Sequence, residues 1–354
     1  MNVHIPARIH CLMQVLMNFP IHLQNDSLTQ PGKVRIMASA VFPKHPKVQE
    51  AKMDIIDTHV HIIETIAGTG AGGELRHIGN GMASYASGET FRALPEQYGK
   101  GSVTAEDILA LMDENHVKRA VLLQGNYFGF QNLASWEAQQ RYPDRFLTAA
   151  SYDPYSRFRD KIRTHLFEEL GIRVVKFEVS TGSGLMSNHK TFPLDGEMME
   201  EEYRYAQEHQ LIFVIDIGKL GSESWQVDAL SRVIARYPGM PFVVCHLLAP
   251  SRTTQKEMEA GLAKLVYDNV YFDLAALPHN IRPEEFPYET AQRYVKSAGE
   301  IVGFDKILFG SDAPSTHKED SYQHLIGFIS ESNLLGTEEK RLILHDNAMR
   351  LFFS

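Results

Sequence analysis

From about residue 53 to the C-terminus, short apolar runs rich in β-forming residues alternate with stretches of helical character. Repeated strand–helix alternation indicates parallel pairing, and eight such units predict an α/β protein folded as a (β/α)8 TIM barrel over residues 53–354. Helices are expected, for example, at Ala105–Asn115, Met198–His209, Asp228–Arg236 and Pro287–Val302. The expected strands are Asp54–His59, Arg119–Leu123, Phe146–Tyr152, Arg173–Glu178, Ile212–Ile217, Phe242–His246, Val270–Leu274 and Ile307–Ser311.

An open doubly wound sheet is the alternative architecture, but no glycine-rich phosphate loop follows an early strand. Residues 68–101 form a long connection rich in glycine and serine after the first expected strand. Connections of that length are typical of functional lids or mobile segments. In a barrel, this one would lie at the C-terminal ends of the strands.

Residues 1–52 differ from the rest of the chain. They show no convincing helical or strand period, and they contain turn formers at Pro31-Gly32 and from Pro43 to Pro46. We therefore expect an unstructured N-terminal extension over residues 1–52. Met53 stands directly before the first expected strand, which suggests the hypothesis that it is the native start.

Composition excludes several classes of protein. The formal net charge of −9 argues against a nucleic-acid binder, which needs a basic face. No stretch approaches the roughly 20 apolar residues of a membrane helix, so no membrane partner is expected. Cys11 and Cys245 are the only two cysteines, which argues against a disulfide framework and fits a cytoplasmic location.

Two histidines lie at the end of the first expected strand, where the run from Ile55 to His61 reads IIDTHVH. Because side chains alternate along a strand, Asp57, His59 and His61 are expected on one face. Neutral imidazole is a common ligand for zinc and similar ions, so the spacing indicates a candidate metal site. A solvated pair of histidines at a strand end is the alternative.

Polar residues also end two later strands. His246 follows the apolar run from Phe242, and Asp312 follows the run from Ile307. Asp312 has an alternative role as a helix cap, since Asp favours that position. Alternation places Cys245 on the face opposite His246, so Cys245 is expected to pack against the helical shell.

Charged residues also occur in two apolar strands. Lys176 and Glu178 share one face of their strand, and Asp216 stands between Ile215 and Ile217. Unpaired buried charge is costly, so these residues need a metal, a ligand or an ion-pair partner. All of these polar residues lie at the C-terminal ends of different expected strands, where barrel enzymes build their active sites.

Four motifs occur in a fixed order over about residues 53–353: IDTHVH at 56–61, YPxxPFVVCH at 237–246, ILFGSDAP at 307–314 and NAMRLF at 347–352. In these motifs the chain resembles the amidohydrolase-related family, the branch of the amidohydrolase superfamily that includes the aminocarboxymuconate-semialdehyde decarboxylases. The resemblance implies that His59 and His61 bind a divalent metal. It also implies that Asp312 binds the metal or takes a proton from its water, and that His246 polarises the substrate or helps to activate the water.

The chain departs from the family pattern at one position. Family members usually carry a metal-binding histidine at the end of the fifth strand, where this chain has Asp216. The difference implies either a more oxygen-rich metal site, completed by Asp216 and Glu178, or a site that has lost its metal. Zinc is the expected cofactor, and an oxygen-rich site would also tolerate manganese.

Loop residues beyond the strand ends are candidates for binding a small-molecule substrate. An arginine fork would suit a substrate carboxylate, whereas surface charge on a solvated loop is the alternative for each residue. Together with Lys176, the candidates are Arg252, His279, Arg282 and His317.

The leading hypothesis is a metal-dependent hydrolase that uses a metal-activated water on an amide, ester or lactone, with Asp312 and His246 as catalytic residues. A metal-dependent, non-oxidative decarboxylase of an unsaturated or aromatic carboxylic acid is the second. A metal-free lactonase and a non-catalytic ligand-binding barrel are further alternatives. Family resemblance alone suggests a homodimer.

Overall fold

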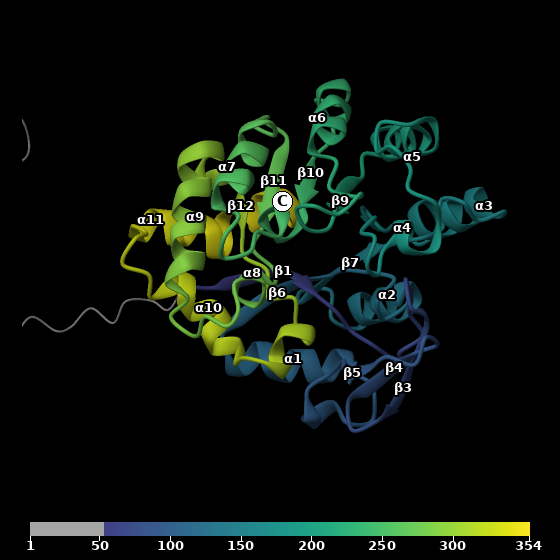
Figure 1. Cartoon of the computed structure of the whole chain (residues 1–354), viewed down its shortest axis with the longest axis horizontal. Helices are drawn as coiled ribbons and strands as arrows, with labels where there is room; N and C mark the ends of the chain where they lie inside the picture. Colours follow the sequence, from purple (N-terminus) through teal and green to yellow (C-terminus); the bar gives the residue numbers. More distant parts are fainter. Residues whose placement is uncertain (1–52) are drawn as a thin grey trace, which may run out of the picture. The chain divides into compact units, whose positions relative to one another are not determined.

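The computed structural model describes residues 53–354, so the predictions for residues 1–52 lie outside the described residues. Eight strands form one parallel sheet in sequence order. The first and last strands meet through the bond from Thr58 N to Phe309 O, 2.9 Å, and a parallel bridge between Val60 and Ala313. The predicted (β/α)8 barrel is therefore confirmed (Figure 1). Its strands are β1 (Ile55–Val60), β6 (Val117–Leu122), β7 (Phe146–Ala150), β8 (Val174–Glu178), β9 (Ile212–Asp216), β10 (Phe242–Val244), β11 (Val270–Asp273) and β12 (Ile307–Leu308).

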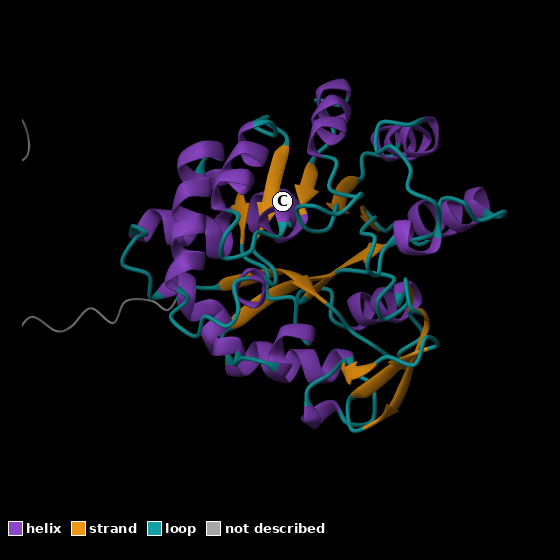
Figure 2. Cartoon of the chain, viewed as in Figure 1, coloured by secondary structure: helices purple, strands orange, loops and turns teal. Residues whose placement is uncertain are grey.

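Helices follow the barrel strands and cover the outside of the sheet (Figure 2). The first begins at Thr104, whose hydroxyl accepts a hydrogen bond from the backbone N of Asp107, while the Asp107 carboxylate accepts one from Thr104 N. No helix within residues 53–354 is long and apolar enough to cross a membrane. The helices are α1 (Ala105–Glu114), α2 (Asn132–Arg141), α3 (Arg159–Arg163), α4 (Leu185–Asn188), α5 (Glu197–Glu208), α6 (Val227–Arg236), α7 (Gln255–Ala263), α8 (Leu277–Asn280), α9 (Glu289–Val302), α10 (Tyr322–Ser330), α11 (Thr337–Arg341) and α12 (Asn347–Phe352).

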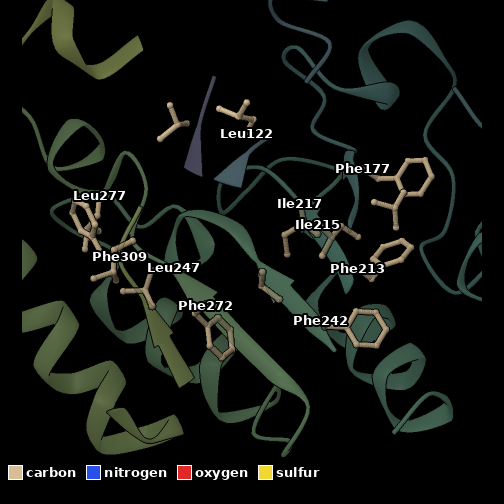
Figure 3. Close-up of a cluster of buried hydrophobic side chains, with 14 of the residues drawn as sticks. Leu122, Phe177, Phe213, Ile215, Ile217, Phe242, Leu247, Phe272, Leu277 and Phe309 are labelled. Carbon is tan, nitrogen blue, oxygen red and sulfur yellow. The ribbon is translucent and has the colours of Figure 1, made fainter. Parts of the chain in front are cut away.

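Alternate residues of the strands belong to two separate apolar clusters. The larger cluster lies between strands and helices and contains the fully buried rings of Phe177, Phe213, Phe242, Phe272 and Phe309 (Figure 3). Burial of such large side chains supplies much of the driving force for folding. The smaller cluster fills the barrel interior and includes α12, which closes it from one side; its members include Val174, Val214, Val243, Leu308, Ala348 and Phe352.

The connection over residues 68–101 is not one long irregular loop, as its composition had suggested. It contains a four-stranded antiparallel sheet of β2 (Thr69–Gly70), β3 (Gly73–Gly79), β4 (Met82–Tyr85) and β5 (Thr90–Arg92). The turn between β3 and β4 has positive φ at Gly79, Asn80 and Gly81, a conformation that glycine and asparagine adopt at little cost. The glycines thus support hairpin turns of an ordered sheet.

The prediction that Cys245 packs against the helical shell is wrong. Cys245 is buried in the interior cluster, beside Val243 of β10. Regular alternation would then turn the next residue outward, but His246 has a left-handed backbone with φ of 61°. The left-handed turn brings the His246 side chain back over the end of the barrel, so alternation fails at this position.

The prediction that Asp57 shares the face of His59 and His61 is also wrong. The pairing of β1 with β6 shifts register between Asp57 and Val60, and this irregularity interrupts the two-residue alternation. The Asp57 carboxylate instead accepts hydrogen bonds from the Tyr322 hydroxyl at 2.6 Å and from Ser311 N at 3.0 Å. It therefore joins β1 to β12 and α10.

Candidate active site

A cavity of about 330 Å³ lies at the C-terminal ends of the barrel strands. A second pocket adjoins it and shares Glu178, Ser183, Asp216, His246 and Asp312 with it. The polar residues that end different strands therefore meet in one place. The predicted site residues that line the first cavity are His59, His61, Lys176, Glu178, Asp216, His246, His279 and Asp312.

His59 of β1 and His61, which follows the strand, converge on Asp312. Oδ1 of Asp312 lies 3.1 Å from Nε2 of His61 and 3.7 Å from Nε2 of His59. Atoms that bind one ion at about 2.0–2.2 Å are separated by roughly 3–3.5 Å in a tetrahedral site. These three side chains thus have the spacing and the atom types of a metal-binding group.

The other ring nitrogen of each histidine is already engaged. Nδ1 of His61 lies 3.0 Å from the Leu123 carbonyl oxygen, and Nδ1 of His59 lies 3.0 Å from Oδ2 of Asp273. A carbonyl oxygen only accepts, so Nδ1 of His61 carries the hydrogen and Nε2 of the neutral ring presents a lone pair. A lone pair that faces a carboxylate oxygen needs a cation or a proton between them, which fits a divalent ion held by His59, His61 and Asp312.

Burial, reinforced by the charge of Lys176, lowers the pKa of His59 from 6.5 to about 4. His59 is therefore neutral at physiological pH, as a metal ligand must be. Burial alone would raise the pKa of Asp312, but its contact with His61 and the nearby His59 and His246 rings hold that pKa below its ordinary value. Asp312 is thus a carboxylate.

Asp273 at the end of β11 is a site residue that the sequence reasoning did not identify. Oδ1 of Asp273 accepts a hydrogen bond from His246 N at 2.8 Å, while Oδ2 contacts His59. His59, His246 and Asp273 form a second group with metal-ligand geometry. The signal in the sequence was a carboxylate at the end of the seventh expected strand, two residues after Tyr271 on the same face.

His246 pairs with Asp216 across the cavity. Nδ1 of His246 lies 2.9 Å from the Ala275 carbonyl, and Nε2 lies 3.5 Å from Oδ2 of Asp216. Burial opposes a charge on the ring, but Asp216 first, then Asp273 and Asp312, raise the pKa of His246 to about 10. The ring is accordingly an imidazolium at neutral pH and acts as a cation.

Asp216 and Glu178 do not belong to either histidine–carboxylate group within the described residues. Glu178 accepts hydrogen bonds from Ser183 Oγ at 2.5 Å and from Asn126 N at 3.1 Å. A Cβ at Gly125 would lie 2.6 Å from Oε2 of Glu178, so a side chain there would displace the Glu178 carboxylate. The assignment of Asp216 and Glu178 as metal ligands stays a prediction.

Of the five predicted substrate-binding residues, Lys176 and His279 line the cavity. Nδ1 of His279 also contacts the Glu319 carboxylate, and Arg282 lies 3.5 Å from the same carboxylate, outside the main cavity. Arg252 lies 3.9 Å from Glu284 and lines a separate pocket.

His317 does not line the cavity either. Its Nε2 is buried and has no hydrogen-bond partner, and burial lowers its pKa from 6.5 to about 4. Within the described residues, no arginine lines the main cavity or the adjoining pocket. The carboxylate fork that the loop arginines suggested is therefore not assembled there.

Aromatic residues form one wall of the cavity. The Phe128 ring lies with its centroid 6.2 Å from that of His61, and the Tyr127 ring packs edge-on against Phe128 at 4.6 Å. Phe91 of β5 and Tyr85 of β4 extend this row of rings from the small antiparallel sheet. The sheet over residues 69–92 thus supports the apolar side of the site.

The sequence profile of the family described as Amidohydrolase matches residues 56–353. None of the curated proteins compared with the chain matches it. Among solved structures, similar chains include a probable 2-pyrone-4,6-dicarboxylic acid hydrolase from Acinetobacter baumannii with citric acid bound, at 19% identity and a TM-score of 0.62. The alignment covers 85% of this chain and 99% of that one.

An amidohydrolase from Burkholderia multivorans with bound zinc is 15% identical, with a TM-score of 0.63 and coverage of 84% and 99% of the two chains. A 5-carboxyvanillate decarboxylase from Novosphingobium aromaticivorans, complexed with manganese and 4-hydroxy-3-methoxy-5-nitrobenzoic acid, is 16% identical, with a TM-score of 0.50 and coverage of 72% and 82%. At these identities the similarity establishes the shared fold.

Proposed function

Because the chain belongs to the amidohydrolase family, we propose that it is a metal-dependent hydrolase that cleaves an amide, ester or lactone bond of a small molecule. The observation that carries the proposal is the convergence of Nε2 of His59, Nε2 of His61 and Oδ1 of Asp312 beside a cavity. A divalent ion held there would polarise the substrate carbonyl and lower the pKa of a water. Two imidazoles and a carboxylate suit zinc and also accept manganese.

The side chains of the protein have distinct tasks in this reaction. Asp312 accepts the proton of the attacking water and returns it to the leaving group. With its pKa raised to about 10, His246 carries a positive charge that stabilises the negative charge growing on the carbonyl oxygen. Asp273 holds His59 and His246 in position through their Nδ1 and backbone N atoms.

Hydrolysis is favoured over decarboxylation by the charges around the cavity. A carboxylic acid substrate would face the carboxylates of Glu178, Asp216 and Asp312, opposed by the ammonium groups of Lys176 and Lys318 and by the His246 ring. The three carboxylates repel an anionic substrate, whereas a neutral amide, ester or lactone does not meet this repulsion. Decarboxylation is the second candidate, and release of carbon dioxide from an aromatic or unsaturated acid would identify it.

Hydrolysis of a panel of small lactones, esters and amides, followed by acid release in a pH-stat, tests the proposal. We expect turnover by the metal-loaded protein and a loss of about 10²–10⁴-fold in Asp312→Asn, since a general base contributes about that much. Asp144→Asn, at an exposed position, is the matched control and should retain full activity. Full activity of Asp312→Asn, or activity in His59→Ala protein that holds no ion, would reject the proposed mechanism and favour a metal-free lactonase.

We also propose a substrate class, an oligomeric state and a cellular location for the enzyme. The similar solved structures bind small molecules such as citric acid, which agrees with a small-molecule substrate for this cavity. A homodimer and a cytoplasmic location stay predictions, and sedimentation and fractionation of cells would test them.

A further inference from the structure

Lys176 lies beside one of the proposed metal ligands. It is in the middle of β8, its side chain points into the barrel, and only 3% of its surface is exposed. Its Nζ lies 3.4 Å from Nε2 of His59. A buried ammonium therefore approaches the same ring nitrogen that a divalent ion would use.

The position of the hydrogen on the His59 ring decides whether Nε2 can accept a hydrogen bond from Lys176. Nδ1 of His59 lies 3.0 Å from the Asp273 carboxylate, which only accepts hydrogen bonds, so Nδ1 carries the hydrogen. Nε2 of the neutral ring then has a lone pair, and Lys176 donates an N–H to it. One lone pair cannot accept this hydrogen bond and bind a metal ion at the same time.

The surrounding charges favour a cation at this position. Glu178 lies on the same face of β8, and Asp216 and Asp312 line the same cavity. A charge buried this deeply is stable only with opposite charges nearby, and these carboxylates supply them. These carboxylates thus stabilise a positive charge at the position of the Lys176 ammonium group.

We propose that Lys176 is a resident cation of the site and competes with a divalent ion for Nε2 of His59. Metal binding then requires the ammonium to move away from His59, and Lys176 sets the metal affinity of the protein. The inference rests on the proposed function, because it concerns the affinity of the same site. A purely structural ion pair between Lys176 and Glu178 would affect folding stability and leave the metal affinity unchanged.

Titration calorimetry of zinc into metal-free protein tests the proposal with a readout that is independent of turnover. We compare the wild type with Lys176→Met, which keeps an unbranched side chain one atom shorter and removes its charge. Lys176→Gln, which keeps a hydrogen-bond donor without the charge, serves as a second variant if the first unfolds. Lys219→Met is the matched control, since Lys219 is an exposed lysine at the wall of the adjoining pocket.

We expect Lys176→Met to bind zinc at least about tenfold more tightly than the wild type, with Lys176→Gln between them and Lys219→Met like the wild type. The gain must also require His59, so Lys176→Met should add no affinity in a His59→Ala background. Equal zinc affinity in the wild type and Lys176→Met, or a gain that persists without His59, overturns the competition.

These outcomes separate the inference from the proposed function. Equal and measurable zinc binding by the wild type and Lys176→Met refutes only the role of Lys176. Binding by Lys176→Met alone supports the competition and refutes the proposal that the wild type works with zinc. Binding by neither protein refutes both.

Discussion

Nδ1 of His59 lies 3.0 Å from Oδ2 of Asp273, and each side chain is only 1% exposed. The pair joins β1 to β11 across the top of the barrel and directs Nε2 of His59 toward Asp312. A carboxylate behind a ligating histidine fixes the tautomer and the orientation of the ring. The orientation of the His59 ring therefore depends on a residue of another strand.

Replacement of this carboxylate should weaken metal binding. Asp273→Asn is expected to lower zinc affinity by about 10–100-fold. The amide can direct an N–H donor at Nδ1 of His59, which would move the ring hydrogen to Nε2 or rotate the ring. Zinc titration of the metal-free protein measures the effect, and Asp268→Asn, at an exposed position, is the control. Unchanged affinity would mean that Asp273 supports the fold without acting on the metal ligand.

Because of the pair of His246 and Asp216, the stability of the folded protein should fall at alkaline pH. The pKa of His246 rises from 6.5 to about 10 in the folded protein, so its stabilisation is complete below pH 6.5 and is lost as pH rises through 10. Asp216→Asn removes the largest favourable cause of this shift. We expect its thermal unfolding temperature to fall less between pH 6.5 and 10 than that of the wild type; parallel pH curves for the two proteins would contradict the ion pair.

The same substitution separates two roles of Asp216. As the ion-pair partner of His246, Asp216 can be replaced by Asn without loss of bound metal. As a metal ligand, its replacement should remove the ion, because a neutral amide binds zinc weakly. Metal content measured by mass spectrometry on purified Asp216→Asn distinguishes the two: the contact of Asp216 with His246 predicts that the ion is retained, and loss of the ion would support Asp216 as a ligand.

Tyr322 should stabilise the fold through its bond to Asp57. Burial raises the pKa of Asp57 to about 6, despite the hydrogen bonds it accepts from Ser311 and Tyr322. Tyr322→Phe leaves the carboxylate with one donor fewer, at a cost of about 1–3 kcal/mol at pH 8, where Asp57 is charged. The loss should be smaller at pH 5, because the protonated carboxyl needs fewer donors.

Urea unfolding at both pH values measures this difference. Tyr155→Phe is the control, since the Tyr155 side chain is substantially exposed and belongs to a different part of the barrel. A loss of stability that is the same at pH 5 and pH 8 would show that the tyrosine hydroxyl does not act on the charge of Asp57.

The phenylalanines between the sheet and the helices should dominate core stability. Phe177 is completely buried and packs against Phe213 and Tyr152. Phe177→Ala is expected to lower the free energy of unfolding by about 3–5 kcal/mol, through lost transfer energy and the cavity left behind. Phe158→Ala, at a position 58% exposed, should change it by less than about 1 kcal/mol. Comparable losses in both variants, measured by urea unfolding, would contradict this assignment.

The sequence pattern was sufficient to predict the barrel, because each strand–helix unit can be recognised from its own hydrophobic pattern. Alternation on β8 placed Lys176 and Glu178 on one face of the strand, and the structure puts both beside the cavity. Alternation failed at Asp57 and Cys245, where a register shift and a left-handed turn interrupt the period of two. Neither irregularity changes the composition of the strand, so periodicity alone could not reveal it.

The sequence by itself determined the order of strands and helices and the residues that end each strand, because hydrophobic periodicity and the strand-end position are local properties. Only the tertiary structure decided which of those residues meet: Asp273 with His59, His246 with Asp216, and Lys176 with His59. Such pairs join strands that are far apart in the sequence, so their geometry depends on how the barrel closes. The loop arginines illustrate the same limit. Arg252 pairs with Glu284 and Arg282 pairs with Glu319, and no residue pattern in the sequence predicts these pairs.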